Sequence, residues 1–368
     1  MWPSILDYDN VMELMPHFLK VDYLKGGRPF YKHSDCGIDD IVASSGGWCR
    51  AYKYDVNGKL YTIRCWYSNA NTNLIDKEFL HRYRNLDNYL KETGLPYFTE
   101  VNFHEEGIEV KEELYPILVL NWVDGVSLKT YIETHRRAEE IENLSKNFAK
   151  MVADLHERHI SHGDLQHDNI LVKQNGELCL IDYDSMYIPD FKGQKELVHG
   201  LPTYQHKSRF ENKFLSEKSD YFSELVIYIT LRALKYDSSL YDRFTDDYLL
   251  FTQEDLHTGQ TPIFDKLKRF DELKPMVETL QEFIKSETID NLKPLEEVLK
   301  NPLDDVVDKL LRLPEHEKNI SKIIKTLTDG EMSDIVGNLD RKPSITVNTH
   351  TTKPTDEEFG QYINKLKI

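Results

Sequence analysis

Residues 162–172 read His-Gly-Asp-Leu-Gln-His-Asp-Asn-Ile-Leu-Val, in which polar side chains lead directly into an apolar strand pattern. Asp164 and Asn169 stand five residues apart in this stretch, and a second apolar run ends at Asp182, 13 residues after Asn169. A carboxylate can accept a hydroxyl proton, while an amide oxygen and a second carboxylate are ligands that suit Mg²⁺. The two motifs at this spacing therefore predict a site for phosphoryl transfer.

The pair of motifs resembles the catalytic loop and the metal-binding segment of the protein-kinase-like superfamily. The resemblance implies an α+β, two-lobed fold, with a small antiparallel β lobe that carries one helix and a large, mostly helical lobe. It also implies ATP and Mg²⁺ as cofactors. Asp164 would orient the substrate hydroxyl and take its proton, and Asn169 and Asp182 would be the metal ligands. An ordinary loop between two strands is the alternative that the same residues allow.

Residues 44–53, Ser-Ser-Gly-Gly-Trp-Cys-Arg-Ala-Tyr-Lys, resemble a glycine-rich loop with an aromatic tip. Backbone N–H groups in such a loop must approach phosphate oxygens closely. Only the middle glycine of the usual pattern is kept, at Gly46, while Ser44 and Cys49 take the outer places, and a plain hairpin turn is the alternative. The residues expected here to contact the nucleotide are Ser45, Gly46, Gly47 and Ala51.

The next strand, expected at residues 60–66, follows an Asn57-Gly58 pair that predicts a two-residue hairpin. Arg64 stands at the position where protein kinases have lysine, as in a group of bacterial kinase-like proteins with an Arg-Cys-aromatic strand here. Arginine is a wider, planar cation, so this exchange is not conservative at a phosphate contact. The resemblance makes Glu78, on a helix expected at residues 74–86, the ion-pair partner of Arg64. A surface cation and a solvated glutamate are the alternatives.

An apolar strand at residues 115–120 leads into Asn-Trp-Val-Asp-Gly, which resembles the hinge between the lobes of a kinase. The resemblance implies that the backbone of Asn121 and Val123 pairs with adenine and that Leu120 is the gatekeeper. Trp122 is equally compatible with an ordinary core position.

Residues 200–206, Gly-Leu-Pro-Thr-Tyr-Gln-His, look like the end of an activation segment, where a protein substrate docks. Asp220 opens a long apolar helix and, by resemblance, hydrogen-bonds the backbone of the catalytic loop, although it could also be a simple helix cap. Gly163 replaces the arginine that pairs with a phosphorylated activation segment in many kinases, so such phosphorylation is not expected to be a switch. Gln166 replaces a lysine near the transferred phosphate, which is an argument for low activity.

The function expected from these motifs is ATP- and Mg²⁺-dependent phosphotransfer to Ser or Thr hydroxyls of a protein. The first alternative is a pseudokinase scaffold that binds nucleotide or a partner protein without catalysis. The second is a small-molecule kinase of the aminoglycoside or choline kinase type, because their catalytic loops also resemble this one.

The chain has 368 residues, with 46 basic and 63 acidic side chains and a net charge of −17, which argues against nucleic acid and anionic membranes as partners. It contains no run of about 18 apolar residues, and its first residues lack a signal peptide pattern, so a cytoplasmic location is expected. The four cysteines, Cys36, Cys49, Cys65 and Cys179, show no metal-binding spacing and indicate no disulfide framework. Cys65 and Cys179 lie in expected strands, so these two are expected to be buried thiols.

Four parts are expected along the chain: an N-terminal extension at 1–37, a small lobe at 38–120, a large lobe at 121–299 and a charged, partly helical tail at 300–368. Low hydrophobicity predicts a flexible stretch in the tail at about 338–356, and the tail is a possible docking arm. Helical patterns in the large lobe are expected at 138–158, 220–236, 272–286 and 292–300.

Overall fold

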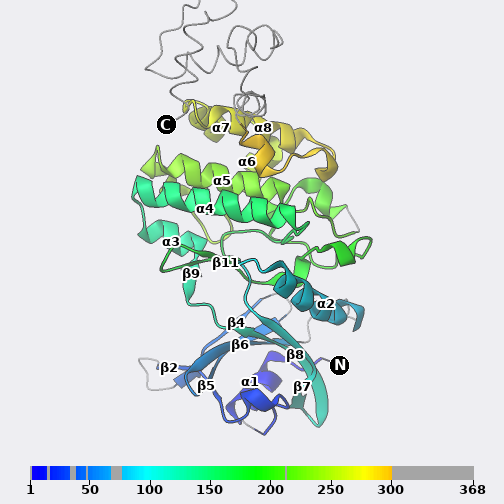
Figure 1. Ribbon diagram of the computed structural model, residues 1–368. Helices are drawn as coiled ribbons and strands as arrows, with labels where there is room; N and C mark the ends of the chain where they lie inside the picture. Colours follow the sequence, from blue (N-terminus) through cyan, green and yellow to red (C-terminus); the bar gives the residue numbers. More distant parts are fainter. Residues whose placement is uncertain are drawn as a thin grey trace, which may run out of the picture. The chain divides into compact units, whose positions relative to one another are not determined.

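The computed structural model describes residues 2–14, 17–33, 39–46, 49–67, 77–211 and 214–300. It divides the chain into two units, Met1–Leu295 and Glu296–Ile368, and the elements below belong to the first unit, apart from the last helix, which crosses the boundary. Gly47, Cys36 and the tail beyond residue 300, including the stretch expected to be flexible at 338–356, lie outside the described residues. The first unit has the predicted α+β, two-lobed architecture (Figure 1).

The small lobe contains a six-stranded antiparallel sheet in the order β1-β5-β6-β8-β7, with β4 paired to β5. Two short strands, β2 and β3, form a separate pair. The strands are β1 (Arg28–Pro29), β2 (Tyr31–His33), β3 (Asp39–Ile41), β4 (Ala43–Ser45), β5 (Cys49–Val56), β6 (Lys59–Trp66), β7 (Val101–Val110) and β8 (Glu113–Asn121).

The hairpin between β5 and β6 confirms the turn predicted from Asn57-Gly58. Both residues have positive φ angles, 53° and 88°, which a tight two-residue hairpin turn requires and which Asn and Gly tolerate best. The turn sets the register of the pair, so that Ala51 lies opposite Arg64 and Tyr54 lies opposite Tyr61. The hairpin therefore brings the expected nucleotide-binding strand beside the expected arginine.

The N-terminal residues pack against this sheet through α1 (Ile5–Glu13), which Figure 1 shows lying within the curve of the strands. Ser4 and Asp7 form a reciprocal cap at the start of α1. The hydroxyl of Tyr8 donates to the carbonyl of Trp66 over 3.0 Å. Each large side chain buried here contributes on the order of 1.5–3 kcal/mol. The buried cluster includes Tyr8, Met12, Leu19, Leu24, Tyr52, Tyr54, Ile63, Ile117 and Val119.

The helix of the small lobe, α2 (Lys77–Thr93), packs on β7. Its predicted range was 74–86, and residues 68–76 lie outside the described part of the chain. An aromatic cluster joins the helix to the sheet: Tyr83 stacks on Phe103 and contacts Trp66, and Phe79 meets Tyr83 edge-on. These contacts fix the side of α2 that faces the site described below.

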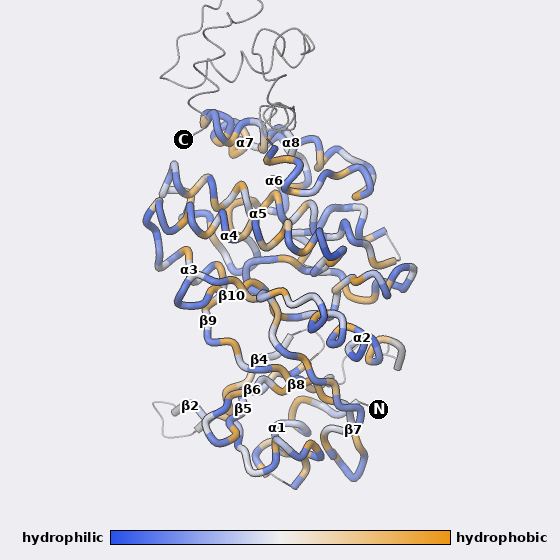
Figure 2. Tube along the Cα trace, viewed as in Figure 1, coloured by the Kyte–Doolittle hydropathy of each residue, from blue (hydrophilic) through white to orange (hydrophobic). Residues whose placement is uncertain are grey.

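The large lobe is built on α4 and α5, which pack against each other, and on a three-stranded sheet in the order β11-β10-β9. Helix α5 is buried over most of its length, which fits a sequence that is mainly apolar (Figure 2). Four helices occur where helical patterns were predicted: α4 (Ala138–Glu157), α5 (Tyr221–Leu234), α8 (Lys274–Lys285) and α9 (Leu295–Val298). The other elements are β9 (Gly125–Ser127), α3 (Leu128–Thr134), β10 (Ile170–Lys173), β11 (Leu178–Leu180), α6 (Gln253–Thr258) and α7 (Pro262–Leu267).

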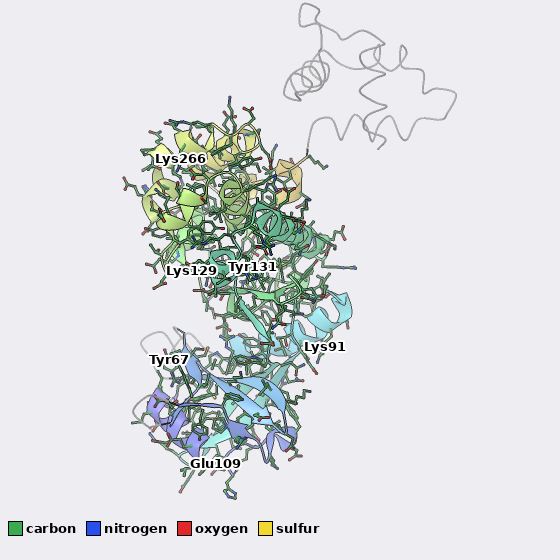
Figure 3. The ribbon with its side chains drawn as sticks, turned by 90° about the vertical axis from the view of Figure 1, so that its left-hand side faces the viewer. Tyr67, Lys91, Glu109, Lys129, Tyr131 and Lys266 are labelled. Atoms are coloured by element: carbon green, nitrogen blue, oxygen red, sulfur yellow. The ribbon has the colours of Figure 1, made fainter. Side chains whose placement is uncertain are left out.

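Figure 3 shows the two lobes from the side, with Tyr67 and Glu109 on the small lobe and Lys129 and Lys266 on the large one. Three of the cysteines, Cys49, Cys65 and Cys179, are buried free thiols, as predicted for the latter two. Across the described ranges, no helix is long and apolar enough to cross a membrane.

Candidate functional site

The two sequence motifs meet because β10 and β11 form a hairpin. Ile170 pairs with Leu180, so the residues just outside the paired ends, Asn169 and Ile181, are neighbours. The N–H of Ile181 donates to the carbonyl of Asn169 over 3.0 Å. This local pairing places Asp182 beside the loop that carries Asp164.

Asp164, the predicted base, is held from two sides. The N–H of Leu201 donates to Oδ1 over 2.8 Å, and the amide nitrogen of Asn169 donates to Oδ2 over 3.0 Å. Burial raises the pKa of Asp164, although these two hydrogen bonds and His162 oppose the rise by favouring the carboxylate. Each oxygen keeps a second lone pair, so the carboxylate can still accept a substrate proton.

The catalytic loop is fixed from below by Asp220, at the start of α5. The carboxylate is 2% exposed and accepts the backbone N–H groups of both His162 and Gly163, the latter over 2.9 Å. The ring of His162 in turn bonds the carbonyl of Ile181 over 2.8 Å. These contacts confirm the loop-holding role expected for Asp220, whose side chain does not cap its own helix.

Gly163 explains one departure from the usual kinase pattern. Its φ is 78°, and a Cβ atom built there would collide with the carbonyl oxygen of Ser185. Neither an arginine nor any other side chain fits this backbone without a shift of the chain. The close approach lets the segment after Asp182 pack directly on the catalytic loop, where Ser161 and Tyr187 exchange backbone hydrogen bonds.

Arg64 is buried, with 7% exposure, so the alternative that it is a surface cation is wrong. Its guanidinium contacts Asp182 at 2.8 Å, Asp184 at 3.1 Å and the sulfur of Cys49 at 3.0 Å. Burial acts to lower the pKa of Arg64, but its anionic neighbours, with Asp184 first, raise it well above its usual range. Arg64 therefore stays charged and joins the small lobe to the predicted metal ligand.

Asp184 and Tyr83 are members of the site that sequence reasoning missed. Asp184 is almost fully buried and accepts from Arg64 through Oδ2 and from the hydroxyl of Tyr83, on α2, through Oδ1. The side chain of Glu78, the predicted partner of Arg64, lies outside the described residues. One sequence feature could have indicated Asp184: it is the third residue of Asp182-Tyr183-Asp184, a place where kinases usually have glycine.

Asp182 has a strained backbone, with φ 67° and ψ 76°, in the left-handed region that non-glycine residues rarely adopt. Such strain persists only when the surroundings impose it, and it concentrates at functional sites. The side chain is 43% exposed, which makes it the accessible acid of the pair with Asp184. Asp182 thus contacts the buried Arg64 through Oδ1 and is still accessible to a ligand.

The residues present fit a nucleotide with Mg²⁺. Among the described residues, the Asn169 side chain makes its hydrogen bonds through the amide nitrogen, which leaves the amide oxygen as a candidate metal ligand. The Nη1 atom of Arg64 is buried without a hydrogen-bond partner among the described residues, and it is a donor suited to a phosphate oxygen. No cluster of three or more His, Cys, Asp or Glu ligands occurs in the described ranges, so the ion would take its remaining ligands from phosphates and water.

The glycine-rich segment is described in part. Gly46 donates its N–H to the carbonyl of Cys49 over 3.0 Å, and a Cβ atom there would meet open space. Among the described residues, nothing near Gly46 requires a glycine at this position, which fits close approach by a ligand. Ser45 accepts a hydrogen bond from Arg50, which also pairs with Asp9 on α1.

At the predicted hinge, the backbone of Asn121 is used by the protein itself. Its N–H donates to the carbonyl of Glu100, and its carbonyl accepts the hydroxyl of Thr99 over 2.9 Å. The backbone of Val123 makes no hydrogen bond within the part of the chain that is described. Trp122 is partly exposed and covers the ammonium of Lys53 at 4.3 Å, so it is not a core residue.

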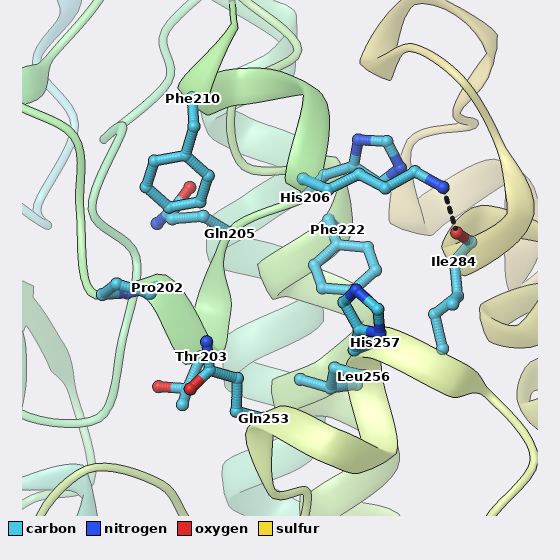
Figure 4. Close-up of a pocket in the computed structure, with 11 residues that line it drawn as sticks. Pro202, Thr203, Gln205, His206, Phe210, Phe222, Gln253, Leu256, His257 and Ile284 are labelled. Carbon is cyan, nitrogen blue, oxygen red and sulfur yellow. Dashed lines mark hydrogen bonds between the residues drawn. The ribbon is translucent and has the colours of Figure 1, made fainter.

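A cavity of about 200 Å³ lies farther along the large lobe, beside Phe210, Phe222 and His257 (Figure 4). Its lining does not include Asp164 or Asp182. Two polar residues of its lining are bonded internally: both ring nitrogens of His206 have partners, and Lys207 donates to the carbonyl of Ile284, the dashed line in Figure 4. The chemistry of the cluster above is separate from this cavity.

The comparison with known proteins agrees with this geometry. The protein kinase domain family matches residues 100–318, more than half of the chain. The matched range begins at residue 100, so it does not include Gly46 or Arg64. A curated relative is CBL-interacting protein kinase 17 of Oryza sativa subsp. japonica, which is 27% identical over 170 residues, 44% of this chain and 35% of that protein. The match thus spans about a third of that relative's length, and the chain belongs to the protein kinase domain family.

Proposed function

We propose that this protein transfers the γ-phosphate of ATP, with Mg²⁺, to Ser or Thr hydroxyls of a protein substrate. The observation that carries the proposal is the convergence of Asp164, Asn169 and Asp182 at one end of the β10–β11 hairpin, on a loop that Asp220 holds. The matched relative is itself a kinase by name, which supports the same reaction class.

Each residue has a role that follows from its contacts. Asp164 orients the substrate hydroxyl and receives its proton on a carboxylate oxygen, while Leu201 and Asn169 keep that carboxylate in one orientation. Mg²⁺, when bound, neutralises charge on the phosphate oxygens. Asn169 and Asp182 would hold the ion, and the unpaired Nη1 of Arg64 would donate to the nucleotide phosphates.

Adenine is expected against the backbone of Val123, whose N–H is not used by the protein in the described residues. Asn121 can contribute only the second lone pair of its carbonyl, because Thr99 already donates to the first. Ser45, Gly46, Gly47 and Ala51 would cover the phosphates, as the sequence predicted. Open space above Gly46 supports this placement.

A nucleotide-binding scaffold without catalysis is the second candidate, and one contact favours it. Arg64 lies 2.8 Å from Asp182 and therefore competes with a metal ion for that carboxylate. In a working kinase, Asp182 must exchange this partner for the ion when nucleotide binds.

The test is transfer of labelled γ-phosphate from ATP to a mixture of basic proteins, with Mg²⁺ and then with Mn²⁺. Asp164→Asn keeps the shape of the base but removes its charge, and Asp168→Asn is the matched control, because Asp168 is an exposed acid of the same loop. We expect transfer by the wild type and by Asp168→Asn, and a loss of about 100-fold or more in Asp164→Asn. Equal rates in all three proteins would refute the assignment of Asp164. Nucleotide binding by calorimetry without any transfer would favour the scaffold.

A further inference from the structure

The segment between Asp182 and residues 200–206, called the activation segment below, has no side-chain hydroxyl group along most of its length. Between Ile188 and Pro202 the sequence contains no Ser, Thr or Tyr. The hydroxyl residues that flank this stretch, Tyr187 and Thr203, are both buried. A phosphate could therefore not be added to the segment in its folded position.

A buried carboxylate occupies the middle of the same stretch. Glu196 forms an ion pair with Arg209, and the two side chains are 1% and 0% exposed. The guanidinium of Arg209 also donates to the carbonyl of Gly163, in the catalytic loop, and to the side-chain oxygen of Gln205. One arginine thus joins the activation segment to the loop that carries the base.

The same stretch is tied to the small lobe through the residue before Glu196. The carbonyl of Lys195 accepts a hydrogen bond from Arg82, on α2, over 3.0 Å. Close to this contact, α2 packs against the segment around Asp184. The cavity left among Phe79, Tyr83 and Phe191 has a volume of only about 10 Å³. Residues 195–196 consequently connect the helix that positions Asp184 with the loop that positions Asp164.

The geometry points to Glu196 as a built-in carboxylate that, paired with Arg209, does the work of an activation-segment phosphate. We infer that Arg209 takes the place of the arginine that cannot fit at position 163, and that the protein is assembled for catalysis as synthesised. This inference rests on the proposed function for its catalytic consequence, but the assembly itself can be measured without nucleotide. Glu196 and Arg209 are positioning residues, since they act on Asp164 through the backbone of Gly163.

Burial makes the pair sensitive to loss of either partner. Removing one charge leaves the other buried and uncompensated, which is more costly than the loss of an exposed ion pair. Salt screens the buried Glu196–Arg209 ion pair little, whereas it would screen a phosphate on the protein surface. The arrangement should therefore hold at any ionic strength at which the protein is folded.

The first experiment measures hydrogen exchange of residues 188–202 in nucleotide-free, full-length protein. Glu196→Gln removes the charge at nearly constant shape, and Asp190→Asn is the control, because Asp190 is an exposed acid in the same segment. We expect exchange to be faster by about tenfold or more in Glu196→Gln and unchanged in Asp190→Asn. Exchange in Glu196→Gln equal to that of the wild type would overturn the inference.

The second experiment measures phosphotransfer by wild-type protein whose mass shows it to be unphosphorylated after phosphatase treatment. We expect its full rate to remain, and we expect Glu196→Gln to lower kcat by about tenfold or more with ATP affinity within about twofold of the wild type. Dependence of the wild-type rate on phosphorylation would overturn the inference. If the wild type transfers no phosphate in any state, the proposed function fails, and the exchange result alone decides whether Glu196 holds the segment.

A third variant, Arg209→Lys, separates loss of positioning from unfolding, because Glu196→Gln could lower activity simply by unfolding the protein. Lysine keeps the charge but cannot reach Glu196, Gly163 and Gln205 at once, because it lacks the planar fork of arginine. We expect an intermediate exchange rate and an intermediate kcat, with a circular dichroism spectrum like that of the wild type. A purely structural role would instead lower thermal stability and leave kcat of the folded fraction unchanged.

Discussion

Replacing Arg64 with lysine tests whether this site is built around arginine. Arg64 stands at the position where protein kinases have lysine. The change to lysine would therefore be harmless if the site needed only a positive charge there. In this structure the guanidinium contacts three groups, Asp182, Asp184 and the sulfur of Cys49. A lysine ammonium is a single point on a flexible stem and cannot keep this geometry.

The contacts set the size of the effect. Lysine can keep one carboxylate contact, so at least one charged hydrogen bond to a carboxylate and the contacts to Cys49 are lost. Each charged hydrogen bond contributes about 1.5–3 kcal/mol. Lysine also lacks the second guanidinium nitrogen, Nη1, that would donate to the nucleotide phosphates, and at about 1.4 kcal/mol for each factor of ten the loss of that charged hydrogen bond predicts a decrease in kcat/KM for ATP of about 10- to 100-fold. The free energy of unfolding should fall by about 1.5–3 kcal/mol, since Asp184 is buried with fewer partners.

The assay is steady-state phosphotransfer at several ATP concentrations, together with urea unfolding of the same preparations. Arg84→Lys is the control, because Arg84 is an exposed arginine of α2 that pairs with Glu105 and, among the described residues, does not contact Asp182 or Asp184. It should leave kcat/KM within about threefold of the wild type, as expected for a more exposed pair. Full activity of Arg64→Lys would refute the reasoning and would show that a charge alone is sufficient.

Two further predictions concern the catalytic loop. Asp220→Asn replaces one acceptor of the His162 and Gly163 N–H groups with an amide donor. We therefore expect the free energy of unfolding, measured with urea, to fall by about 1.5–3 kcal/mol. An unchanged value would mean that other contacts hold the loop. Leu201→Pro removes the N–H that stabilises ionised Asp164, and the φ of −58° at Leu201 already suits proline. Because the base must be ionised, transfer falls as the pH drops through the pKa of Asp164, which burial already raises. The acid limb of kcat/KM should therefore lie at higher pH in Leu201→Pro than in the wild type, and coincident profiles would contradict this role for the Leu201 N–H.

Local sequence was enough to predict the features that depend on short-range geometry. Asn57-Gly58 specifies its hairpin because few other residues adopt two consecutive positive φ angles. Asn169 and Asp182 come together because one β-hairpin separates them, so their spacing alone carries the information. The long helices α4, α5 and α8 were found for the same reason, because their apolar periodicity is sustained, whereas the shorter α3, α6 and α7 were not found.

Partners that meet only in the tertiary structure could not be predicted in this way. Arg64 lies 118 positions from Asp182, and neither residue's neighbours in sequence indicate that the two side chains meet. Tyr83 appears in the sequence as one more apolar position of a helix, although its hydroxyl reaches Asp184. Glu196 looks like an ordinary surface glutamate between a lysine and a leucine, and its burial follows only from where the activation segment packs.

The departures from the usual kinase pattern are linked in this structure. Asp184 adds a buried carboxylate beside the more exposed Asp182, and a fork-shaped cation can contact both, which accounts for arginine at position 64. One arginine among Asp164, Asp182 and Asp184 leaves an excess of two negative charges when all three acids are ionised. A divalent cation matches that excess, which a retained lysine in the catalytic loop would have reduced. The glutamine at position 166 is therefore compatible with a working, metal-dependent site, and its presence is not by itself evidence of decay.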